Sequence, residues 1–270
     1  MESDTALYRV RRDIDRRNKT DMRLYPTMAF AVIVIYTFVA FYRGIFFEDA
    51  EDVRSFSIAI VGAGLVLAMM YVLATRVNKH NKRDASLMAD VCDFLEEHHP
   101  EGKDNRDIQI MRGLIPGTTT QFILFLFFFA TLFPAAFGAL IYARGLTDDP
   151  DRLAMWLVVI SFVLGLCIIL VNINFPRRHE KRFIRFSDAT VRVLETMGVS
   201  MVGYGQVIGG RNVYLLIVLS LVTFGLFIIV WLCISMRDFN RHISEQWNYE
   251  DRLLTALVML EVSQNPPAES

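Results

Sequence analysis

The residues of this chain that could do chemistry are five histidines and three cysteines, and their spacing predicts no catalytic or metal site. His80 and His179 each begin a basic cluster, which favours a position at a polar interface over metal ligation. His98 and His99 are adjacent, so on a helix their side chains point about 100° apart and form a poor ligand pair. The histidines alone therefore indicate no chemistry.

Motifs for other chemistries are missing as well. The sequence contains no HExxH, no Cys-x-x-Cys, no GxSxG and no phosphate-binding loop. The segment GYGQVIGG (203–210) lacks the dinucleotide-loop spacing and a preceding strand, so it is interpreted as a flexible linker. The cysteines, none with a partner at metal-like spacing, are Cys92, Cys167 and Cys233. We therefore expect a non-enzyme with no catalytic residue, cofactor or bound metal.

Five long runs without Asp, Glu, Lys or Arg dominate the elements that would position these residues. They are 24–42, 55–75, 121–143, 153–175 and 212–236. Each could cross a hydrocarbon core of about 30 Å as a helix. With 53% hydrophobic residues, the pattern predicts an all-α polytopic integral membrane protein with five membrane segments.

The distribution of basic residues predicts an orientation. Lys plus Arg number seven in each of 1–24, 76–120 and 176–211, but only two in each of 43–54 and 144–152. By the positive-inside rule, the N-terminus and both long loops face the cytoplasm. The predicted location is the plasma membrane, with several crossings.

An internal repeat relates two parts of the chain. HNKRDASLMADVCDFLE (80–96) matches HEKRFIRFSDATVRVLE (179–195) ninety-nine positions later, with His80 aligned on His179. Each copy follows a charge-free run, so the chain is interpreted as two tandem membrane hairpins that share one orientation.

The predicted organisation has seven parts. They are a cytoplasmic amphipathic segment (1–23), hairpin unit 1 with its cytoplasmic helix (24–98), a cytoplasmic linker (99–120), hairpin unit 2 with its helix (121–197), a Gly-rich linker (198–211), a fifth membrane segment (212–236) and a C-terminal amphipathic helix with a disordered end (237–270).

Apolar residues at helical spacing follow both basic clusters and recur near both ends of the chain. These faces could pack on one another, lie on the inner leaflet or dock another protein. The residues expected to contact lipid headgroups or a partner are Lys82, Arg83, Arg177, Arg178, Lys181 and Arg182.

The apolar runs hold a few polar residues and no charged one. Those that could line a pore or a helix junction are Thr131, Asn172, Asn174 and Thr223, although hydrogen bonds to helix backbones are the plainer interpretation. The fifth run is expected to cross fully. The alternative is a re-entrant segment that breaks near 223–225.

The same stretch carries a local similarity. TFGLFIIVW (223–231), followed by RDFN (237–240), resembles a Thr-x-Gly…Trp signature of uncharacterised small prokaryotic membrane proteins. The resemblance covers about twenty residues, and it implies a membrane location and little more.

These patterns lead to two functional hypotheses. The first is a non-enzymatic assembly, partner-binding or regulatory module that acts through amphipathic helices at the inner leaflet. The second is an oligomeric passive channel lined by Ser, Thr, Asn and backbone groups. The expected partners are the bilayer with its anionic headgroups and either copies of the chain or another membrane protein, with no nucleic acid.

Overall fold

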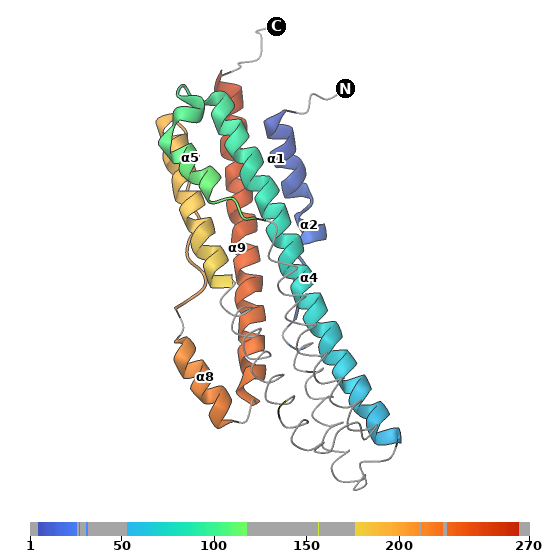
Figure 1. Ribbon diagram of the computed structural model, residues 1–270. Coiled ribbons are helices and arrows are strands. Elements are labelled where there is room, and N and C mark those ends of the chain that lie inside the picture. The colour runs from blue at the N-terminus through green and yellow to red at the C-terminus, as the bar shows by residue number, and fades with distance from the viewer. Residues whose placement is uncertain are drawn as a thin grey trace. The chain divides into compact units, whose positions relative to one another are not determined.

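A computed structural model describes residues 5–25, 53–117, 176–210, 212–223 and 226–264, with single positions at 27, 31 and 156. Every regular element in these ranges is helical. The chain divides into two units, Met1–Pro116 with Pro176–Ser270, and Gly117–Phe175. Nearly all the described residues belong to the first unit, which Figure 1 shows as a bundle of long helices.

The elements of this unit are α1 (Ala6–Asp15), α2 (Arg17–Thr20), α4 (Val53–His98), the 3-10 helix η1 (Gly102–Asp104), α5 (Arg106–Gly113), α8 (Val213–Val222) and α9 (Leu226–Gln264). A further helical segment, 176–196, carries no label and is drawn in yellow in Figure 1. The helix α4 runs unbroken, as the lack of Pro and Gly between residues 65 and 97 predicts.

Local sequence sets where the helices begin and end. The Thr5 hydroxyl accepts the Tyr8 N–H at 3.3 Å and caps α1. The segment 176–196 ends at Gly198, whose φ of 81° lies in the left-handed region. The Val199 N–H then donates to the Leu194 carbonyl at 2.9 Å, which closes a Schellman motif.

The apolar faces of five helical segments pack against one another in one core, to which α5 contributes Ile108 and Met111. Helix α4 contributes Leu87, Met88, Val91, Phe94 and Leu95; the segment 176–196 contributes Phe183, Phe186 and Leu194; α1 contributes Val10 and Ile14; α9 contributes Leu253 and Leu257. Of the three interpretations of these faces, mutual packing is therefore the one observed.

The prediction of a membrane-spanning fold is wrong for the part of the chain described. None of the helices described there combines the length and the hydropathy that a bilayer crossing needs. The run 212–236 forms two helices, and α8, with ten residues, rises only about 15 Å, half of a hydrocarbon core. The fold class is therefore corrected from a polytopic, multi-pass membrane protein to an all-helical fold. The assignments to the plasma membrane and to a channel, which depended on five spans, are withdrawn with it.

The remaining runs have different outcomes. The run 55–75 is part of α4, which continues into the polar stretch that follows it. The runs 121–143 and 153–175, apart from position 156, lie outside the described residues, as does almost all of 24–42. Thr131, Asn172 and Asn174, the candidate pore or junction residues, lie outside them too.

Candidate metal centre

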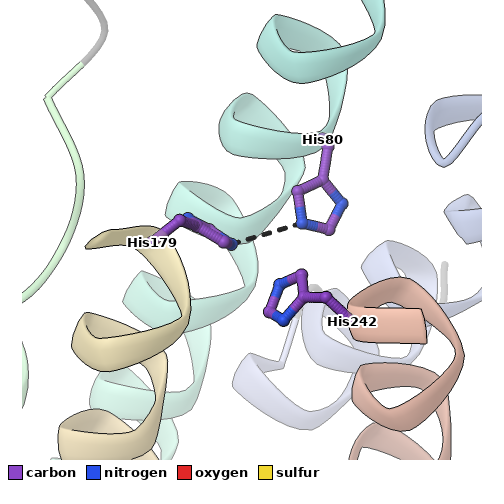
Figure 2. Close-up of side chains that lie close together, drawn as sticks. All are labelled: His80, His179 and His242. Atoms are coloured by element: carbon purple, nitrogen blue, oxygen red, sulfur yellow. Dashed lines mark hydrogen bonds between the residues drawn. The ribbon is translucent and has the colours of Figure 1, made fainter. Parts of the chain in front are cut away.

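Three histidines from three separate helices meet inside the bundle. His80 comes from α4, His179 from the segment 176–196 and His242 from α9, and each is at most 2% exposed. One ring nitrogen from each lies within 4.8 Å of the other two. The Nε2 atoms of His80 and His179 are 3.3 Å apart, and the three rings point toward a common centre (Figure 2).

Hydrogen bonding on the outer side fixes the ring of His80. Its Nδ1 lies 2.9 Å from Oδ1 of Asp21, so that Nδ1–H donates and Nε2 faces the centre. The other oxygen of Asp21 accepts the Trp247 indole N–H at 2.8 Å and lies 2.9 Å from Nη1 of Arg83. A carboxylate behind a histidine in this way is a common support for a metal ligand.

A different chain of groups orients His242. Its Nδ1 lies 2.8 Å from the Tyr204 hydroxyl, which donates onward to Oε1 of Glu180 at 3.2 Å. Because that hydroxyl proton is used by Glu180, the His242 Nδ1–H is the donor and its Nε2 carries the lone pair. This Nε2 is buried without a hydrogen-bond partner. An unpaired buried acceptor of this kind costs about 1–3 kcal/mol.

The neutral ring of His179 has the opposite tautomer from the rings of His80 and His242. Arg182 donates from Nη2 to the His179 Nδ1 at 2.9 Å, which leaves the proton of a neutral ring on Nε2. That Nε2 lies 2.9 Å from Oδ2 of Asp84, the residue one helical turn after His80 on α4.

The pKa values of these groups are shifted in opposite directions. Burial lowers the pKa of His179 and lowers that of His242 far below its usual value. Burial also acts against protonation of His80, but the carboxylates of Asp84 and Asp21 outweigh it and raise the pKa of His80. Burial opposes ionisation of Asp84 as well, yet the neighbouring His80 and His179 hold the pKa of Asp84 well below its usual range.

Several buried charged groups surround the centre. Four carboxylates, from Asp21, Asp84, Glu180 and Glu250, face two guanidinium groups, from Arg76 and Arg83. The half-buried Arg182 adds a third guanidinium group beside His179, and burial raises the pKa of Glu250 to about 7, so the net charge is less negative than four carboxylates suggest. Since buried charge is costly unless it is compensated, these opposite charges stabilise one another.

A glycine-rich loop supports the centre from one side. Glu180 accepts the backbone N–H of Val207 at 2.8 Å and that of Ile208 at 3.0 Å, in addition to the Tyr204 hydroxyl. The Tyr204 N–H donates to Ser187 at 2.7 Å. These hydrogen bonds hold the segment 203–210, interpreted from the sequence as a flexible linker, to the helical segment 176–196.

The residues predicted to touch lipid headgroups or a partner do not share one environment. Arg83 is buried and pairs with Asp21, Asp84 and Glu250, at 2.5 Å to the last, so it is not free for such a contact. Arg182 is half-buried against His179, and Arg177 is half-buried near Gly210. The exposed members are Lys82, Arg178 and Lys181.

Thr223, predicted as a pore or junction residue, bonds to helix backbones. Its hydroxyl donates to the Leu219 carbonyl at 2.7 Å and accepts the Phe227 N–H at 3.0 Å. It thus links the end of α8 to the first turn of α9, in agreement with the plainer interpretation of the sequence.

The three-histidine cluster was not predicted from the sequence. Two signals pointed toward it: the pairing of His80 with His179 in the repeat, and the His-x-x-x-Asp spacing of His80 and Asp84. His242, in the segment RDFNRH (237–242), has no counterpart in the repeat that would link it to the other two histidines.

Comparison with known proteins adds no further guide to this centre. No protein-family model matches the sequence, and neither the curated proteins nor the solved structures give a significant match.

Proposed function

We propose that the protein binds one divalent transition-metal ion at His80, His179 and His242, and that it is a non-enzymatic helical module stabilised by that ion. The observation that carries the proposal is the buried His242 Nε2, which lacks a hydrogen-bond partner while a nitrogen from each of the two other imidazoles lies within 4.8 Å. Imidazole nitrogen suits Zn²⁺, Cu²⁺, Ni²⁺ and iron, and not Mg²⁺ or Ca²⁺, which prefer oxygen.

A stabilising role fits the burial of the ligands better than catalysis does. The side chains of His80 and His179 are 0% and 1% exposed, and catalytic metal sites keep one position open to water or substrate. The three ligands come from helices far apart in sequence, so one bound ion would tie α4, the segment 176–196 and α9 together.

The test is isothermal titration of the untagged, metal-free chain with Zn²⁺ and, separately, with Mg²⁺. We expect one Zn²⁺ per chain and no Mg²⁺ binding. His242→Ala should abolish Zn²⁺ binding, whereas His99→Ala is the matched control, because His99 lies at the far end of α4 and bonds Thr196 at 3.2 Å. Equal Zn²⁺ binding by the chain and by His242→Ala, or no binding by either, would contradict the proposal.

A further inference from the structure

The two oxygens of Asp84 have different surroundings. Oδ1 accepts the Gln246 side-chain N–H at 2.7 Å and the Arg83 guanidinium N–H at 3.1 Å. Oδ2 is buried and faces the histidines: it lies 2.9 Å from His179 Nε2 and 3.3 Å from His80 Nε2. One oxygen therefore anchors the carboxylate while the other is directed at the centre.

Resting on the metal site proposed above, we infer that Asp84 Oδ2 is the fourth ligand and that the ion is held in a closed, tetrahedral site of three histidines and one aspartate. The i, i+4 spacing of His80 and Asp84 places both side chains on one face of α4, so a single helix supplies two ligands.

The separations among three of the four donor atoms fit this geometry, and a nitrogen of His242 lies within 4.8 Å of those of His80 and His179. Bonds of about 2.0–2.1 Å at tetrahedral angles place ligand atoms about 3.3 Å apart. The His80–His179 and His80–Asp84 separations are both 3.3 Å. The His179–Asp84 separation is shorter, at 2.9 Å, and would widen as the ion takes the place of the direct contact.

The groups behind the ligands support the same assignment. Asp21 holds His80, Tyr204 holds His242, and Gln246 with Arg83 holds Asp84. For His179, metal binding at Nε2 moves the ring proton to Nδ1, so Arg182 must release that atom. Arg182 Nη2 also donates to Asn81 Oδ1 at 3.1 Å, and this hydrogen bond can remain when the contact with His179 is lost.

A site of three imidazole nitrogens and one carboxylate oxygen favours some metal ions over others. Zn²⁺ has no preferred geometry arising from its d electrons and accepts four ligands of this kind. Ions that demand six oxygen ligands, such as Mg²⁺, are excluded by both the number and the type of donors. The ligand class is therefore a four-coordinate divalent ion, with Zn²⁺ as the fitting member and Co²⁺ as its spectroscopic probe.

The experiment is visible absorption of the untagged, metal-free chain titrated with Co²⁺. Four-coordinate Co²⁺ gives intense d–d bands, whereas six-coordinate Co²⁺ gives weak ones. We expect intense bands that saturate at one equivalent. Asp84→Asn should weaken the bands and lower Co²⁺ affinity by more than about tenfold, a loss at least equal to that of a supporting group.

Asp90→Asn is the matched control, since Asp90 lies on the same helix and pairs with Arg9 at 2.9 Å, away from the histidines. Its spectrum should equal that of the unsubstituted chain. Bound Co²⁺ with weak bands, or bands unchanged in Asp84→Asn, would overturn the four-ligand inference and leave metal binding intact. No Co²⁺ binding at all would reject both.

A second measurement does not depend on any variant. X-ray absorption at the zinc edge of the Zn²⁺-loaded chain should give four nitrogen or oxygen neighbours at about 2.0–2.1 Å. Five or six neighbours at longer distance would overturn the inference.

Discussion

Two stretches of one helix, α4, are buried for opposite reasons. Residues 87–95 bury an apolar face that contributes to a core shared with α1, α9 and the segment 176–196. Residues 76–84 bury Arg76, His80, Arg83 and Asp84. The two stretches are both buried, but burial affects their stability differently. Apolar burial stabilises the fold directly, whereas each buried polar group must be compensated by a partner.

Hydrophobic burial alone accounts for the position of the apolar stretch. Each fully buried Leu, Phe or Met contributes about 1.5–3 kcal/mol relative to exposure, and this stretch supplies several such side chains. No bound group is needed to account for its position in the fold.

The polar stretch is different, since its burial depends on ion pairs and it lies beside an imidazole acceptor, on His242, that has no hydrogen-bond partner. Replacing such a network by apolar residues is often neutral or stabilising. The metal ion proposed above would supply the missing partner, because its donor types match the imidazole nitrogens.

The largest expected effect is from Arg83→Met, which keeps the aliphatic stem and removes the charge. Asp21, Asp84 and Glu250 would lose their shared partner, so we expect a loss of about 3–5 kcal/mol in unfolding free energy by urea denaturation. The double variant Arg83→Met with Glu250→Gln should recover part of this loss. A single variant as stable as the unsubstituted chain would show that the polar stretch is not electrostatically coupled.

The next largest effect is expected from a substitution in the apolar stretch of α4. Leu95→Ala, at a side chain with 0% exposure, should cost about 2–5 kcal/mol by the same measurement while leaving Zn²⁺ stoichiometry at one. Met259→Ala on the exposed side of α9, where the residue is 61% exposed, is the control and should change little. Loss of Zn²⁺ binding in a folded Leu95→Ala would mean that the two stretches are not separable.

The smallest effect concerns an ion pair outside both stretches. Arg192 lies 2.6 Å from Asp107, with its side chain 51% exposed. Arg192→Ala should cost less than about 1 kcal/mol, and the difference should shrink further as salt is added. A cost near that of Arg83→Met would contradict the distinction drawn here between buried and exposed pairs.

The burial of the apolar helix faces could be predicted from the sequence. Val91, Phe94 and Leu95 recur at helical spacing, as do Phe183 and Phe186, and all five are buried where that spacing places them. Proline cannot continue a helix, and α4 ends at His98, two residues before Pro100.

The polar cluster around the histidines could not be predicted from the sequence, because it depends on which helices pack beside one another. His80 and Asp84 are close in sequence, but His242 meets them only through the packing of α9. The same limit explains the mistaken membrane spans: hydropathy reports a run such as 212–236 without showing that it divides into α8 and α9. Charge type alone likewise placed Arg83 at a surface, although three acidic partners hold it inside.

The measurement that tests the central claim most directly is thermal unfolding of the untagged chain, stripped of metal and then reloaded with Zn²⁺. With free Zn²⁺ at about 100 times its dissociation constant, binding to the folded state alone should add about 2.7 kcal/mol of stability and raise Tm accordingly. His242→Ala should show no rise. A Tm that is the same with and without Zn²⁺, or an equal rise in His242→Ala, would contradict the account.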